Sequence, residues 1–209
     1  MPLSDLYSNI NFLFRWLHVI TGIIWLGHLY FFNFVTIPLR RAFDETERKT
    51  AYPKLMLRSL WWSRWGAMIA FLTGPVLFVM NYLYVPGVGF GPTALFIDNQ
   101  GITARAAWVM FGMVLAAVMW FNVWFIVWPA FKREMSGGVL SAEHLQVLRR
   151  RSFRASRTNA FLSGPMLFGM LAPAHYGAIN LEVWLIALAI GILVIWGAIK
   201  LSSSVGTSV

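Results

Sequence analysis

The sequence predicts an all-α integral membrane protein, and three observations support this fold class. Of the 209 residues, 58% are hydrophobic and only 12% are charged, whereas a soluble domain carries about 25% charged residues. The mean hydropathy is +0.64, and the chain contains eleven Trp and seventeen Phe. Long stretches without any charged residue recur along the chain. Together they exclude a small soluble enzyme.

Five charge-free stretches are candidates for membrane-spanning helices, because about 20 apolar residues are needed to cross a hydrocarbon core of about 30 Å. They cover residues 16–39, 65–97, 106–131, 158–181 and 183–199. The second stretch ends in Pro-Gly-Val-Gly-Phe-Gly-Pro, a composition typical of turns. We therefore expect one membrane domain over residues 1–209, with five helices near 10–37, 60–84, 104–131, 154–173 and 182–200.

Basic residues predict the orientation of these helices. The second loop holds only Arg105, at its end, and the fourth loop holds none. The first and third loops are rich in them: Arg40, Arg41, Arg48, Lys49, Lys54 and Arg58, then Lys132, Arg133, Arg149, Arg150, Arg151, Arg154 and Arg157. Because basic loops remain cytoplasmic, we expect the N-terminus outside and the C-terminus inside, in a cell inner (cytoplasmic) membrane.

The net charge of +9 is therefore interpreted as a topology signal, and nucleic acid is not an expected partner. A docking patch for an acidic partner or for lipid head groups is the alternative interpretation of the basic loops.

An internal repeat joins two helix pairs at an offset of 90 residues. Phe71–Met80 (Phe-Leu-Thr-Gly-Pro-Val-Leu-Phe-Val-Met) recurs at 161–170 as Phe-Leu-Ser-Gly-Pro-Met-Leu-Phe-Gly-Met. At the same offset Arg15 corresponds to Arg105, and His18 to Trp108. The repeat units cover about 10–84 and 104–173, and the fifth helix is an unpaired addition. Because both units begin outside, we expect a pseudo-twofold axis along the membrane normal.

Two further features are interpreted as structural. Ser141–Leu148 is typical of a short interfacial helix capped by Ser141, and its His144 is given no site role. Tyr30, Asn33 and Asn81 lie inside or at the edge of spans and are expected to form hydrogen bonds with backbone or with one another across helices.

His18 and His28 lie inside the first span, and an ionisable residue within a membrane is a candidate functional residue. Haem ligation, proton relay and an interhelical hydrogen bond are all open to them. His18 lies about 12 Å below the outer end of its helix, and His175 follows the outer end of the fourth helix. If these helices are neighbours, His18 and His175 are the candidate metal ligands of one haem b.

Other residues near these histidines complete the candidate cofactor site. His28 lies deeper than His18 and is turned by about 80° around the helix, so it cannot bind the same iron, but it leaves a second haem possible. Gly22 lies on the face of His18, where a small residue lets a flat ring approach. Arg15 and Arg105 are candidates to pair with haem propionates, and lipid phosphates are the alternative partners. The absence of cysteine excludes a covalent c-type haem, iron–sulfur clusters, zinc–thiolate sites and disulfides.

The opening segment 15–27 (Arg-Trp-Leu-His-Val-Ile-Thr-Gly-Ile-Ile-Trp-Leu-Gly) resembles the first helix of the membrane-bound urate oxidase family, also called the urate oxidase N-terminal domain. The resemblance continues through Val123–Arg133, Arg157–Phe168 and His175-Tyr176. It implies a membrane electron-transfer module with outward-facing redox chemistry. By this resemblance, His18 and His175 occupy positions where the family has histidine. Trp108 and Thr158 stand where we would expect histidine from the family, and His28 stands where the family has a small residue.

In that family a C-terminal cytochrome c domain usually follows the membrane domain. This sequence ends eight residues after Leu201, so we expect that domain to be absent. Three functions follow as hypotheses. The first is a b-type haem electron-transfer subunit, with other membrane subunits or a periplasmic cytochrome c as partners beside membrane lipid. The second is a urate oxidase working with a separate cytochrome c.

The third hypothesis is a haem-free accessory subunit of a larger respiratory or photosynthetic complex. It is supported by the Trp residues of the third helix. Trp120, Trp124 and Trp128 are four residues apart and form one stripe, which suits either a partner surface or packing within the chain.

Overall fold

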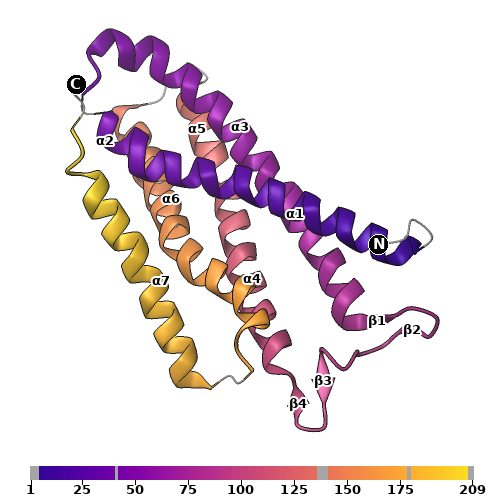
Figure 1. The fold of residues 1–209 in the computed structure, drawn as a ribbon. Helices are drawn as coiled ribbons and strands as arrows, with labels where there is room; N and C mark the ends of the chain where they lie inside the picture. The colour runs from indigo at the N-terminus through magenta and orange to yellow at the C-terminus, as the bar shows by residue number, and fades with distance from the viewer. Residues whose placement is uncertain (1–4, 41, 136–140, 178–179, 207–209) are drawn as a thin grey trace.

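The computed structural model describes residues 5–40, 42–135, 141–177 and 180–206, and within these residues the protein is a bundle of long helices (Figure 1). The first helix runs without a break through α1 (Leu6–Tyr30), a π-helical turn η1 (Phe31–Thr36) and α2 (Ile37–Leu39). The second comprises α3 (Glu45–Phe78) and the π-helical η2 (Val79–Leu83). The third comprises α4 (Ala104–Phe121), the π-helical η3 (Asn122–Val127) and α5 (Trp128–Met135).

The fourth helix, α6 (Ala142–Leu171), ends in a 3₁₀ turn η4 (Ala172–Ala174), and α7 (Leu181–Ser202) is the last. Two of these helices are much longer than the expected spans, because α3 begins at residue 45 and α6 at residue 142. The expected cap is present, since Ser141 accepts a hydrogen bond from the backbone N–H of His144. The expected separate interfacial helix is instead the first part of α6.

Side chains also cap the starts of other helices. They accept hydrogen bonds from first-turn backbone N–H groups, which have no partner within the helix. Asp44 and Glu47 form a capping box at the start of α3. Asp5 caps α1, and hydrogen bonds from Ser8 hold the pKa of the Asp5 carboxyl below its ordinary value.

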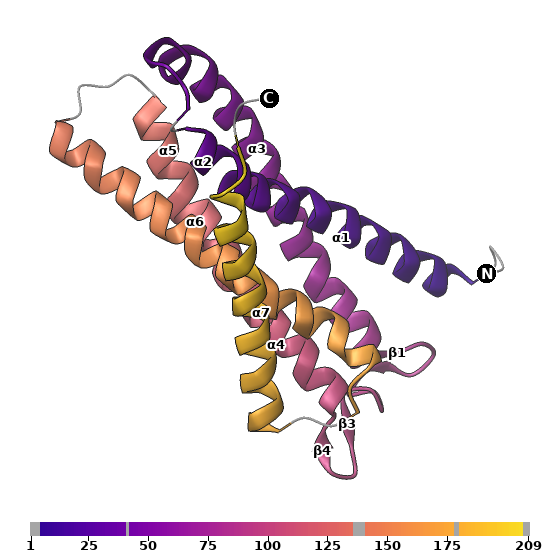
Figure 2. The same cartoon turned by 60° about the vertical axis from the view of Figure 1, so that its left-hand side comes forward.

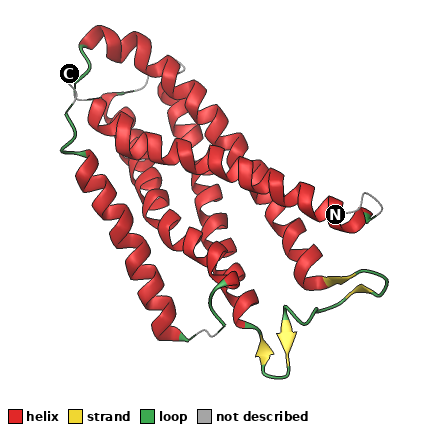
Figure 3. Cartoon of the chain, viewed as in Figure 1, coloured by secondary structure: helices red, strands yellow, loops and turns green. Residues whose placement is uncertain are grey.

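Two small hairpins join the second and third helices (Figure 3). In the first, β1 (Tyr84–Val85) pairs antiparallel with β2 (Gly89–Phe90), and in the second, β3 (Ile97–Asp98) pairs antiparallel with β4 (Gly101–Ile102). The expected turn at 86–92 is therefore present as a hairpin, with positive φ at Gly87 and Gly89. The all-α prediction did not include these four short strands.

Four helices in the described part of the chain are long and apolar enough to cross a membrane: Leu6–Leu39, Glu45–Leu83, Ala104–Glu134 and Leu181–Ser202. The first, third and fifth expected spans lie inside them, and the second, 60–84, extends one residue past Leu83 into β1. The fourth expected span, 154–173, belongs to α6, which is not among the four. The count of five spans and the orientation stay predictions, and Arg41 lies outside the described residues.

The polarity of α6 has a structural reason, because this helix lies at the centre of the bundle. It contacts α4, α5, α7 and the first helix, and Figures 1 and 2 show it between α7 and α4. Its buried face includes Asn159 and Ser163, both with 0% exposure. A helix that faces protein on several sides does not need the apolar surface that lipid requires. Hydropathy alone therefore underestimates how well α6 is suited to cross a membrane.

Polar side chains join α6 to its neighbours, as expected for membrane bundles. The hydroxyls of Tyr30 and Ser163 are 3.0 Å apart, and Asn33 donates to the Ser156 hydroxyl. These contacts, together with the Asn11–Asn81 bond between α1 and η2, confirm the cross-helix role expected for Tyr30, Asn33 and Asn81. A further bridge was not expected from the sequence: Asn159 accepts from Asn122 at 2.7 Å and donates to the Met119 carbonyl.

The two helix pairs of the sequence repeat pack through different glycines. In the first pair, a Cβ at Gly66 would lie 3.0–3.1 Å from atoms of Thr21, Ile24 and Trp25 on α1, while Gly22 has no neighbour within 4 Å. In the second pair, Gly112, the counterpart of Gly22, lies against the backbone of Gly169 on α6. The expected pseudo-twofold relation therefore does not extend to these helix contacts.

Candidate functional site

His18 is held in one tautomer by a short chain of hydrogen bonds between α1 and α3. Its Nδ1 lies 2.9 Å from the hydroxyl of Thr73, and that hydroxyl lies 2.7 Å from the carbonyl oxygen of Ile69. A carbonyl only accepts, so the hydroxyl proton points to Ile69 and the hydroxyl oxygen accepts from His18 Nδ1–H. The lone pair of His18 is therefore on Nε2, the arrangement in which a neutral imidazole binds a metal while its other nitrogen donates.

Space for the His18 ring comes from the Gly-Pro motif on the facing helix. A Cβ at Gly74 would lie 3.3 Å from His18 Cε1, so a larger residue would press on the imidazole. Gly22, predicted to open the face of His18, has nothing within 4 Å of its Cβ position. The side chain of His18 is half-buried. The sequence repeat thus contributes both Thr73 and Gly74 to the surroundings of His18.

His28 also presents a free nitrogen. Its Nδ1 lies 2.7 Å from the carbonyl oxygen of Ile24, which makes Nδ1 the protonated nitrogen and leaves the lone pair on Nε2. Together with Ile23, Gly27 and Ser59, the histidine lines a small cavity of about 330 Å³ between α1 and α3. His18 does not line this cavity, and separate sites for the two histidines stay a prediction.

His175 lies on another part of the bundle. It directly follows η4 and is exposed. Its neighbour Tyr176 packs against Trp108 and Phe168, with ring centroids 6.0 and 5.5 Å apart. In both views the end of α6 lies beside α4 and away from the N-terminal half of α1 (Figures 1 and 2). Among the described residues no hydrogen bond or ring contact joins His175 to His18, and their joint ligation of one iron stays a prediction.

The two arginines predicted near the outer helix ends have protein partners. Arg15 lies within 3.4 Å of the side-chain oxygens of Asn11 and Asn81. Arg105 donates from Nε to the carbonyl oxygen of Pro173, at 3.0 Å, and so ties the start of α4 to η4, two residues before His175. Both guanidinium groups are exposed. Pairing with propionates or lipid phosphates remains a prediction for both.

His144 is exposed in the first turn of α6 and belongs to no cluster. Among the described residues there is no group of three or more His, Asp or Glu side chains that could hold a metal ion.

An arginine inside a tryptophan cage was not predicted from the sequence. The guanidinium of Arg64 lies 4.0 Å from the ring centroid of Trp128 and 4.7 Å from that of Trp124, and the Trp124 indole N–H donates to the Arg64 carbonyl. Trp120 stacks on Phe71 at 4.1 Å. The tryptophan stripe is thus used to pack the third helix against α3. The signal for it was available, because Arg64 and these tryptophans are near the same predicted membrane boundary.

These features define a multi-pass α-helical membrane protein with half-buried histidines on its first helix. A family model described as urate oxidase N-terminal matches residues 89–201, just over half of the chain. The chain belongs to this family, and the resemblance noted in its sequence is confirmed. The match covers β2 to α7, so it includes Arg105 and His175, whereas His18 and His28 precede it. No curated protein and no solved structure matches the chain.

Proposed function

We propose that this protein is a membrane-embedded electron-transfer subunit that binds one b-type haem with His18 as an axial ligand. The observation that supports the proposal is the chain from Ile69 through Thr73 to His18 Nδ1, which leaves Nε2 as the free nitrogen. The residues fit the haem at this one ligand. A bound haem would supply reversible one-electron transfer at its iron.

The residues of the chain would hold and insulate such a group. Thr73 fixes the tautomer of His18, and Gly74 leaves room for its ring. Apolar side chains of α1 and α3 would exclude water. The lower dielectric constant would strengthen the electrostatic interaction of the haem with each nearby charge. Arg15 and Arg105, both exposed at helix ends expected to face outward, would add positive charge for propionates.

A reduced-minus-oxidised spectrum of the purified full chain, expressed with haem available, tests the proposal together with the haem-to-protein ratio. We expect a b-type absorption band and a haem-to-protein ratio near one, because the proposal assigns one haem, to His18. A spectrum without any b-type band would remove the proposal. A ratio near two would indicate a second bound haem, and His28 would be its candidate ligand within the first span.

The family match favours a second function, oxidation of urate by this protein with a separate cytochrome c. It predicts that urate reduces added cytochrome c only in the presence of the membrane protein, and that His18→Ala loses this activity. If haem is bound and urate reduces nothing, the electron-transfer function is retained without urate as its donor. The accessory-subunit hypothesis gains no support from the tryptophan stripe, because the stripe packs within the chain.

A further inference from the structure

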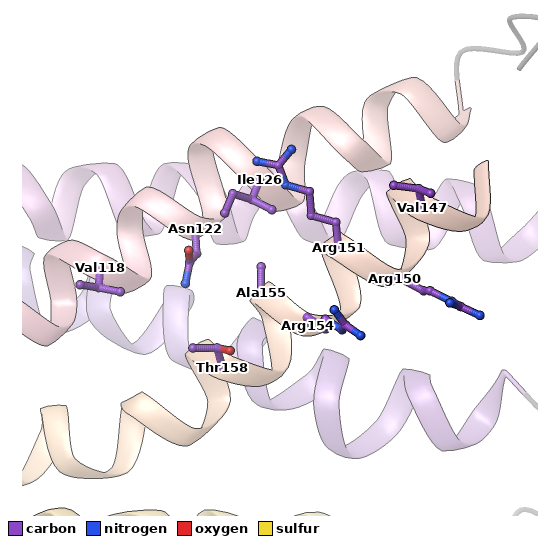
Figure 4. Close-up of a pocket in the computed structure, with 9 residues that line it drawn as sticks. All are labelled: Val118, Asn122, Ile126, Val147, Arg150, Arg151, Arg154, Ala155 and Thr158. Atoms are coloured by element: carbon purple, nitrogen blue, oxygen red, sulfur yellow. The ribbon is translucent and has the colours of Figure 1, made fainter. Parts of the chain in front are cut away.

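A groove of about 590 Å³ lies between the third helix and α6, at the end of the bundle where the basic residues gather (Figure 4). One wall is formed by residues of α4 and η3, and the other by the N-terminal half of α6. The wall on the third helix includes the π-helical turn η3, and such turns occur frequently at functional sites. The groove contains none of the histidines discussed above.

One end of the groove is strongly positive. Arg150, Arg151 and Arg154 line it and are exposed. Figure 4 shows their side chains projecting from α6. In the described parts of the chain no ion pair involves them, although the adjacent Arg149 is paired with Glu134 at 2.7 Å. Three guanidinium groups are thus available for an anion, and guanidinium pairs well with phosphate oxygens.

The remainder of the groove is mainly apolar. Val118 and Ile126 line it from the third helix and Ala155 from α6, whereas Val147 precedes the arginines on α6 and lies at the opposite end from Val118 (Figure 4). Val118 is 43% exposed, so this deeper surface needs a partner that is itself apolar. Because α4 runs inward and α6 outward in the expected topology, Val118 lies deeper in the membrane than the three arginines.

The polar residues at the deeper end do not form a second anion site. One of the two Asn122 side-chain N–H groups is donated to Asn159 at 2.7 Å, and neither Asn122 nor Thr158 carries a charge. A small planar anion such as a purine would leave the apolar residues of the groove uncovered. A molecule with a phosphate at one end and an acyl chain at the other would match both ends at once.

We propose that this groove binds one anionic phospholipid of the cytoplasmic leaflet. The phosphate lies among Arg150, Arg151 and Arg154, and one acyl chain lies along Val118 and Ile126. The expected orientation places the arginines in the leaflet that carries anionic lipids, and basic pockets between membrane helices on this side recognise such head groups. The proposal does not depend on haem or on urate.

Native mass spectrometry of the full chain in neutral detergent tests it by titration with phosphatidylglycerol. Phosphatidylcholine of the same chain length, inorganic phosphate and urate are titrated in parallel. We expect one phosphatidylglycerol to bind in preference to phosphatidylcholine, with little binding of phosphate or urate. Equal binding of the two lipids, or binding of phosphate or urate as tight as that of phosphatidylglycerol, would overturn the proposal.

Two variants separate the head group from the acyl chain. Arg150→Gln with Arg154→Gln should weaken phosphatidylglycerol binding about 25-fold, from about a 5-fold loss for each arginine near the surface. Lys54→Gln with Arg58→Gln is the matched control, because these residues have the same spacing on α3 and are exposed. Val118→Trp keeps all charges and fills the apolar end. Unchanged lipid affinity in Val118→Trp, or an equal loss in the control pair, would contradict the assigned position.

Discussion

Replacement of His18 by alanine is expected to abolish the b-type haem absorption of this protein while its helical content is retained. The half-buried imidazole is the one group on α1 that combines a tautomer fixed from the facing helix with a neighbouring glycine that makes room for its ring. Removing it would take away the nitrogen ligand that we propose for the haem iron. The measurement is the haem-to-protein ratio from the reduced-minus-oxidised spectrum, with circular dichroism of the same sample as the check on folding.

Rescue by added imidazole distinguishes loss of the ligand from loss of the fold. Imidazole can occupy the space left in His18→Ala and should restore the band if that nitrogen is the ligand. Thr73→Val removes the acceptor for Nδ1–H at nearly constant volume, and haem retention should weaken about 10-fold to 100-fold, as for other partners of metal-ligating histidines. His144→Ala is the silent control. A normal band in His18→Ala without imidazole would show that His18 is not the ligand.

His175 and His28 are distinguished by the same measurement. Loss of the band in His175→Ala would show that the exposed segment after η4 reaches the haem in the assembled protein. An unchanged band would leave His18 with a different second ligand or with an open coordination position. Loss of the band in His28→Ala alone would move the site to the cavity between α1 and α3.

Charge-free stretches were sufficient to predict where the apolar helices lie, because lipid tolerates few charges at any position. They were not sufficient to predict where the helices begin and end. Residues 45–59 of α3 and 142–153 of α6 are polar helical segments that extend beyond the apolar part of each helix. Their composition is as polar as that of a loop, so the sequence did not distinguish them from loops. The capping box of Asp44 and Glu47 was the local signal that α3 starts at residue 45.

The candidate site was predictable only in part, for a related reason. A histidine inside a span can be recognised from one segment, but its partners depend on the register of two helices. The repeat suggested that both pairs would pack alike, yet the first pair is closest at Gly66 and the second at Gly112 and Gly169. Small residues permit close approach wherever they meet, so a shared sequence motif does not determine a shared register. The pairing of His18 with Thr73 follows from that register.

The contact between α6 and α7 gives the largest expected effect on stability. A Cβ at Gly191 would lie 2.5 Å from the backbone nitrogen of Pro165, and a Cβ at Gly164 would lie 2.3 Å from the Gly191 carbonyl oxygen. Backbone atoms cannot move aside as a flexible side chain can, so Gly191→Ala must separate the two helices. We expect a loss of about 1–3 kcal/mol in the free energy of unfolding, the usual cost of overpacking.

Gly197→Ala is the matched control, since Gly197 is in the same helix and has nothing within 4 Å of its Cβ position. Alanine is the better helix former by about 1 kcal/mol, so this variant should be as stable as the original chain or more stable. Unfolding of both variants by a denaturing detergent, followed by tryptophan fluorescence, measures the difference. Equal stabilities would show that α7 does not pack on the Gly-Pro motif of α6. The fifth helix would then be held by its apolar surface alone, and the second Gly-Pro motif would have no packing role comparable to that of Gly74 beside His18.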